Sequence, residues 1–137
     1  MYGIYKNHLA NFSFDLSLPS IPPIVVDRAK LLFMDSFVAV VSGTQTSIAL
    51  SLSKNLSSLS PTEASHTNSS ISMNDRHQSF LFSALTYGFS MVCQELDEGN
   101  PKAKGHPACH FFPALLAEAE RNETYSGTQI LEAFIIG

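Results

Sequence analysis

The chain is poor in basic residues and in cysteine, and each shortage excludes a class of function. Lys and Arg total 8 of 137 residues and form no run, so a surface that follows nucleic-acid phosphates is not expected. Only Cys93 and Cys109 are present, without a CxxC motif, which argues against a structural zinc site and against a disulfide framework. We therefore predict a cytoplasmic protein that holds no metal.

Long apolar runs are also missing. The most apolar stretch, 31–41, is too short to span a bilayer and contains Asp35, so no transmembrane helix is expected. Residues 1–14 lack the basic start and the uninterrupted apolar core of a secretory signal. The sequence predicts no contact with a membrane and indicates mature protein from the first residue.

What the chain does contain is apolar sequence at helical spacing. Apolar residues make up 45% of the chain, enough for one domain with a buried core, and they recur three and four apart along most of it. We therefore predict an all-α, bundle-like fold that forms a single domain over 1–137. Helices are expected at 2–14, from Pro23 to a stop at Gly43, and at 46–59, 76–94, 107–121 and 126–136.

Two details of the fourth predicted helix can be read from single residues. Asp75 is suited to cap its N-terminus, and Gly88 within it indicates a close helix crossing. The range before it, 57–74, is rich in Ser, Thr and Asn, which compete with the backbone for hydrogen bonds. We predict that 57–74 is a flexible loop.

Charge is concentrated in one segment, 95–113, which reads ELDEGNPKAKGHPACHFFP. The chain as a whole is only 15% charged, yet this segment opens with the carboxylates Glu95, Asp97 and Glu98. Glycine and proline within it prevent one continuous helix, so it is predicted to be a loop. A loop can turn several carboxylates and an imidazole toward one point.

The imidazole in question is His106, which Gly105 and Pro107 frame. Glycine permits close approach of the backbone, and proline suits the first turn of the helix that follows. His106 is thereby placed at a helix N-terminus, which favours bound anions such as a substrate carboxylate. We predict that this ring and the acidic residues converge on one anion-sized hollow.

The same residues carry a family resemblance. ELDEGN, a short basic spacer, GHPA and the apolar helix PALLAEAE resemble the acidic-loop and GHP segment of the MmgE/PrpD family. That family includes 2-methylcitrate dehydratases, cis-aconitate decarboxylases and iminodisuccinate epimerases. Flanking stretches such as LPSIPPIVVDRAKLLFMDSFVAVVSGT and YSGTQILEAFIIG are also similar, so the resemblance covers essentially the whole chain, as the beginning of the family's sequence.

The resemblance implies acid/base chemistry beside a carboxylate of a small polycarboxylic acid, with no metal and no organic cofactor. It implies that His106 is a general acid/base or contacts a substrate carboxylate, a task suited to the side chain that titrates nearest neutral pH. Asp97 and Glu98 match the family's acidic pair, and Glu95 matches a further acidic position. Gly99 stands where dehydratase and decarboxylase members commonly have Thr.

Three further residues are assigned to substrate binding. Lys102 and Lys104 lie between the acidic residues and the histidine and would attract an anionic substrate, without a catalytic role of their own. Gly105 would let the backbone approach the ligand.

The resemblance also predicts the organisation of the protein. Since members are much longer, we expect the chain to be an incomplete N-terminal part of a two-domain enzyme that lacks some of the catalytic set. Its broad apolar faces predict a homo-oligomer, a dimer in this family.

Alternatives remain for several of these residues. The chain is alternatively a catalytically incomplete helical fragment or an interaction module. The charged segment 95–113 is alternatively an ordinary solvated surface loop. His106 and His110 have the H-x-x-x-H spacing that can bind metal. Cys109 is a nucleophile or, as is commoner, a small buried side chain.

Overall fold

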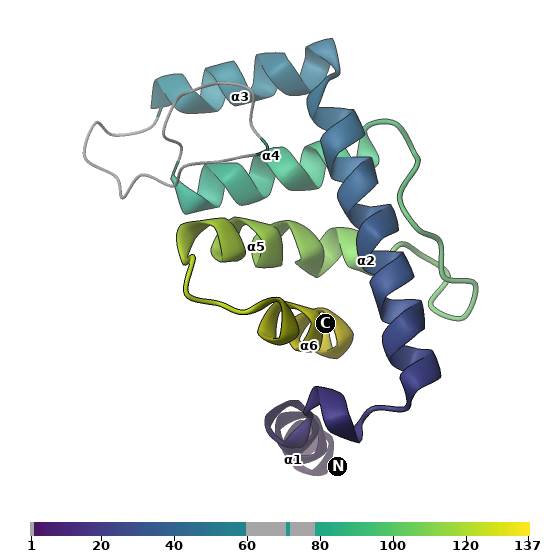
Figure 1. Ribbon diagram of the computed structural model, residues 1–137. Helices are drawn as coiled ribbons and strands as arrows, with labels where there is room; N and C mark the ends of the chain where they lie inside the picture. The colour runs from purple at the N-terminus through teal and green to yellow at the C-terminus, as the bar shows by residue number, and fades with distance from the viewer. Residues whose placement is uncertain (1, 60–70, 72–78) are drawn as a thin grey trace.

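The structure, a computed structural model, describes residues 2–59, 71 and 79–137. In these ranges the chain is helical, with an isolated bridge between Asn100 and Gly105 and no strand (Figure 1). The prediction of an all-α fold is confirmed. The elements are α1 (Tyr2–Asp15), the 3-10 helix η1 (Leu18–Ser20), α2 (Pro23–Thr44), α3 (Ser47–Leu59), α4 (Phe80–Val92), α5 (Ala108–Arg121) and α6 (Gly127–Ile136).

The helix ends follow local chemistry. Pro23 begins α2, where a missing amide hydrogen costs nothing. The N-cap Ser126 of α6 accepts a hydrogen bond from the backbone of Gln129, whose side-chain oxygen accepts from the Ser126 amide in return. Both helix starts fall within one residue of the positions that the sequence predicts.

The start of α4 was predicted incorrectly. Ser79, not Asp75, is its N-cap, and the Ser79 side chain accepts a hydrogen bond from the Phe82 amide. The predicted loop also begins too early, because α3 continues through Leu59. The rest of 57–74, apart from Ile71, lies outside the described residues, as does Asp75.

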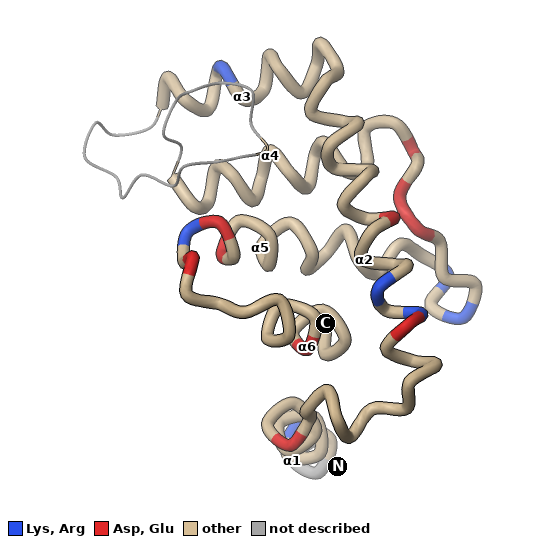
Figure 2. Tube along the Cα trace, in the orientation of Figure 1, with Lys and Arg blue, Asp and Glu red and all other residues tan. Residues whose placement is uncertain are grey.

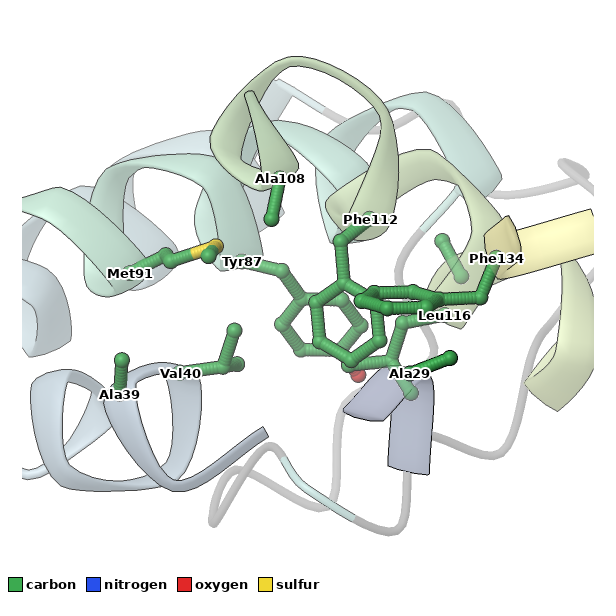
Figure 3. Close-up of a cluster of buried hydrophobic side chains, with 10 residues drawn as sticks. Ala29, Ala39, Val40, Tyr87, Met91, Ala108, Phe112, Leu116 and Phe134 are labelled. Carbon is green, nitrogen blue, oxygen red and sulfur yellow. The ribbon is translucent and has the colours of Figure 1, made fainter. Parts of the chain in front are cut away.

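The core lies where α2, α4, α5 and α6 meet. In Figure 1, α4 and α5 run side by side, α2 crosses them, and α6 follows beside α5. Tyr87 and Met91 of α4, Val40 of α2 and Phe112 of α5 are almost completely buried. The Phe112 ring meets the ring of Phe134 edge-on at 5.5 Å between centroids, which adds α6 to the cluster (Figure 3).

Helices α2 and α4 approach each other closely at Gly43. A Cβ built on Gly43 would overlap the carbonyl group of Ser90, whereas one built on Gly88 would lie in ordinary contact with Pro113, 3.6 Å away. Gly43 is therefore a packing residue inside α2 rather than the residue that ends it, and the tight crossing expected at Gly88 is found at Gly43.

Small hydroxyl residues are also buried on these two helices. Ser36 of α2 and Ser83 and Ser90 of α4 are almost completely buried, and their hydroxyls have no hydrogen-bond partner within the described residues. Burying these hydroxyls without a partner costs stability. Among the described helices, none is long and apolar enough to cross a membrane.

The Gly43 crossing gives a direct test of the packing. We expect Gly43→Ala to destabilise the fold by about 3 kcal/mol, since the added methyl must displace backbone rather than a flexible side chain. Urea unfolding followed by circular dichroism measures the loss. Gly127→Ala is the matched control, because a Cβ there meets nothing within 4 Å. An unchanged unfolding midpoint in Gly43→Ala would contradict the close approach of α2 to α4.

Candidate functional site

The loop between α4 and α5 is folded back on itself by Asn100. The side-chain oxygen of Asn100 accepts hydrogen bonds from the amides of Lys102 and Ala103, at 2.9 and 3.1 Å. The Asn100 amide donates to the Gly105 carbonyl at 2.8 Å, with a weaker return bond at 3.4 Å. Lys104, at φ 53°, makes the turn between these paired residues. This small closed turn returns the chain toward the acidic residues that precede it.

The turn brings the His106 ring against Asp97 and Glu98. His106 Nδ1 lies 3.1 Å from Asp97 Oδ2 and 2.8 Å from the backbone carbonyl oxygen of Glu98. The Asp97 side chain is only 5% exposed, while that of His106 is 54% exposed. Because a carbonyl oxygen can only accept, Nδ1 carries the hydrogen, and Nε2 is left available on an open ring.

Glu98 ties the loop to the start of α5. Its Oε1 accepts a hydrogen bond of 2.6 Å from the Ala108 amide, one of the amides that a helix N-terminus leaves without a partner. Oε2 is buried and has no partner within the described residues. The anion at this helix N-terminus is therefore the protein's own carboxylate, in the position where we expected a substrate carboxylate.

The remaining predicted residues lie outside this contact. Glu95, at φ 53°, is exposed, as are Lys102 and Lys104. None of these three side chains forms an ion pair or a hydrogen bond within the described part of the chain. Gly105 contributes backbone groups to the turn and has an ordinary φ.

A cavity of about 680 Å³ adjoins the loop. It lies between the N-terminal part of α2, the loop, the start of α5 and the end of α6, and apolar side chains such as Leu32, Phe111 and Phe134 form most of its wall. Glu98 and Lys102 border it, but His106 and Asp97 do not. The structure thus brings the His106 ring together with Asp97 and Glu98. Of these two acidic residues, only Glu98 also lines the cavity.

The alternative metal site receives no third ligand. Across the described residues, no group of three or more His, Cys, Asp and Glu side chains is arranged to hold a metal ion. His110 is exposed on the first turn of α5, four residues after His106, and its side chain has no hydrogen-bond partner among the described residues.

Cys109 is held against the same loop. Its thiol donates to the His106 carbonyl at 2.9 Å. Burial raises the pKa of the Cys109 thiol, and the nearby carboxylates of Asp97 and Glu98 raise it further. A raised pKa lowers the thiolate fraction at neutral pH, which disfavours the role of nucleophile.

Asn100 is the residue that sequence reasoning missed. It organises the turn, yet no role had been assigned to it. The signal was available, because asparagine directly before proline favours turn initiation, and Asn100 precedes Pro101.

Comparison with known proteins identifies the family. The sequence profile of the MmgE/PrpD N-terminal domain matches residues 7–137, almost the whole chain. The chain belongs to the MmgE/PrpD family. No curated protein and no solved structure matches it. The helical fold of this MmgE/PrpD chain agrees with that of the family's N-terminal domain.

The Cys109 environment predicts slow alkylation. In the folded chain, the pH at which iodoacetamide labelling of Cys109 reaches half its maximal rate should lie above that of the urea-unfolded chain, since only the thiolate reacts. Site-resolved mass spectrometry separates Cys109 from Cys93. Faster labelling of Cys109 in the folded chain than in urea would contradict the raised pKa.

Proposed function

We propose that this MmgE/PrpD chain is the N-terminal portion of a lyase that acts on a small polycarboxylic acid, as 2-methylcitrate dehydratases do. The observation that carries the proposal is the contact of His106 with the buried side chain of Asp97, at 3.1 Å. Among the described residues it joins an open imidazole to a carboxylate held out of solvent. This is the arrangement that orients a histidine for proton transfer.

The two ring nitrogens of His106 take different parts in this proposal. Nδ1 is held as a donor by Asp97 and by the Glu98 carbonyl, which fixes the tautomer and the direction of the ring. Nε2 then accepts the proton removed from the carbon beside a substrate carboxylate. The proton is returned to the departing hydroxyl, so that water leaves and a carbon–carbon double bond forms.

Glu98 and the lysines support this chemistry indirectly. By holding the Ala108 amide, Glu98 fixes the distance between the loop and α5, and so the place of the ring. Lys102 and Lys104 are exposed beside the acidic residues, where their charge would attract a polyanionic substrate. Glu95, also exposed, is available to a substrate but is not positioned by any side-chain contact within the described residues.

Decarboxylation and epimerisation remain the alternatives within the family. Both also need a proton placed on or taken from carbon beside a carboxylate, so the His106–Asp97 pair serves all three reactions. Gly99 stands where dehydratase and decarboxylase members commonly have Thr, so a position beside the acidic pair has no side chain here.

Turnover of 2-methylcitrate by the purified chain tests the proposal. We expect formation of the unsaturated product, with kcat lowered about 10²- to 10⁴-fold in His106→Ala, because a positioned general acid/base contributes that much. His110→Ala is the matched control, since His110 is an exposed histidine four residues away whose side chain forms no ion pair or hydrogen bond with the acidic residues in the described structure. Release of CO₂ from cis-aconitate is measured in parallel.

Complete inactivity of a folded wild-type chain would favour the catalytically incomplete helical module over an active site that works within this chain. Equal activity in His106→Ala and the wild type would overturn the role of the ring.

A further inference from the structure

One side of α2 is an apolar stripe that nothing in the described structure covers. Leu31, Met34, Val38 and Val41 are 64%, 58%, 58% and 37% exposed. They lie three and four residues apart, so they form one row along the helix, opposite the side that packs on α4. We call these four residues the α2 seam.

The spacing of the α2 seam is that of a coiled coil. Leu31 and Val38 occupy a positions of a heptad, and Met34 and Val41 occupy d positions. Ile24 would continue the pattern toward the N-terminus, but Asp27 stands at the d position between Ile24 and Leu31, so the seam begins at Leu31. A row of a and d residues packs best against another such row.

The charges beside the α2 seam are complementary to those of a second copy. Lys30 is at the g position and Asp35 at the following e position, on opposite sides of the seam. In a parallel pair of helices, g of one chain faces e of the next heptad of its partner. Lys30 would therefore face the partner's Asp35, and the two-fold symmetry would repeat this ion pair.

The free chain leaves these groups available. Among the described residues, the one ion pair of Lys30 is with Asp27, at 3.5 Å, and this exposed pair contributes little. Asp35 forms neither an ion pair nor a side-chain hydrogen bond within the described residues. Beyond Asp35, α2 carries no charged side chain, as Figure 2 shows toward its C-terminal end.

An antiparallel pairing fits less well. Placing Leu31 opposite Val41 and Met34 opposite Val38 would bring the two Asp35 carboxylates side by side near the symmetry axis. Lys30 would then face Thr44 rather than an acidic group. Like charges placed together across an interface disfavour it, so the charges select the parallel orientation.

The apolar surface extends beyond the α2 seam. A groove of about 450 Å³ lies between α2 and α6, with Phe33, Met34, Ile130 and Leu131 among its lining residues. Met34 belongs to both the seam and the groove, so a helix seated on the seam would also cover the mouth of the groove. This enlarges the area available for association beyond the four seam residues.

We propose that the α2 seam is the dimer interface of this protein, with the α2 helices of two copies packed in parallel and Lys30 paired with the partner's Asp35. The proposal goes beyond the chemistry at His106 and does not depend on it. It gives the expected homodimer a specific surface, register and orientation.

Sedimentation velocity on charge variants tests the register. Lys30→Asp and Asp35→Lys, each alone, place like charges together and should raise the dimer Kd about tenfold. The double variant Lys30→Asp/Asp35→Lys restores both pairs and should return Kd to the wild-type value. Failure of the double variant to recover would overturn the parallel register.

Val38→Asp tests the surface itself. A carboxylate at the centre of the α2 seam should raise Kd about 100-fold, since it would be buried against its own copy. Val25→Asp is the matched control on the same helix, off the seam, and should remain dimeric. A wild-type chain that stays monomeric up to its solubility limit, or a Val38→Asp variant that still dimerises, would overturn the proposal.

Disulfide cross-linking reports the orientation. In a background with Cys93 and Cys109 changed to Ser, Val38→Cys should form a disulfide-linked dimer on oxidation, because identical a positions face each other only in the parallel pair. Efficient cross-linking of a Met34→Cys/Val38→Cys mixture, without either homodimer, would show the antiparallel pairing instead and overturn the proposal.

Discussion

The hydrogen bond from the Ala108 amide to the Glu98 carboxylate is the constraint on which the arrangement of the site depends. It joins the end of the acidic loop to the first turn of α5, and α5 is fixed in turn by Phe112 in the core. Packed helices hold both ends of the loop, so the turn at Asn100 has to connect only a short segment between fixed ends. The backbone of this turn then positions the His106 ring beside Asp97, so that the contact does not depend on the side chain's own rotational freedom.

The helices could be predicted because each signal is local. Apolar spacing and proline set the extents of α2 and α5, and Ser126 with Gln129 marks the start of α6. The errors arose where tertiary contact decides. Gly43 has the usual appearance of a helix-ending glycine, yet its role is to let Ser90 approach, which no local pattern reveals.

The candidate site was predictable as a set of residue types but not as a geometry. The sequence predicts an imidazole beside carboxylates, and the structure places His106 on Asp97. The sequence alone does not predict that the Glu98 carboxylate accepts a hydrogen bond at the N-terminus of α5, or that Asn100 forms the turn. Both depend on which backbone amides point toward the loop. The family assignment rests on the match of residues 7–137 to the family's N-terminal domain, and it does not depend on the geometry of the candidate site.

The uneven distribution of charge has a colloidal consequence. Charged side chains gather in the loop between α4 and α5, around the C-terminal end of α5 and between Asp27 and Asp35 of α2, while long stretches of helix surface carry none (Figure 2). The net charge of −4 is therefore the sum of a few patches and offers little mutual repulsion elsewhere. At a pH near the sequence pI of about 5.6 the net charge falls to zero, and the uncharged helical surfaces would then govern how molecules associate in concentrated solution.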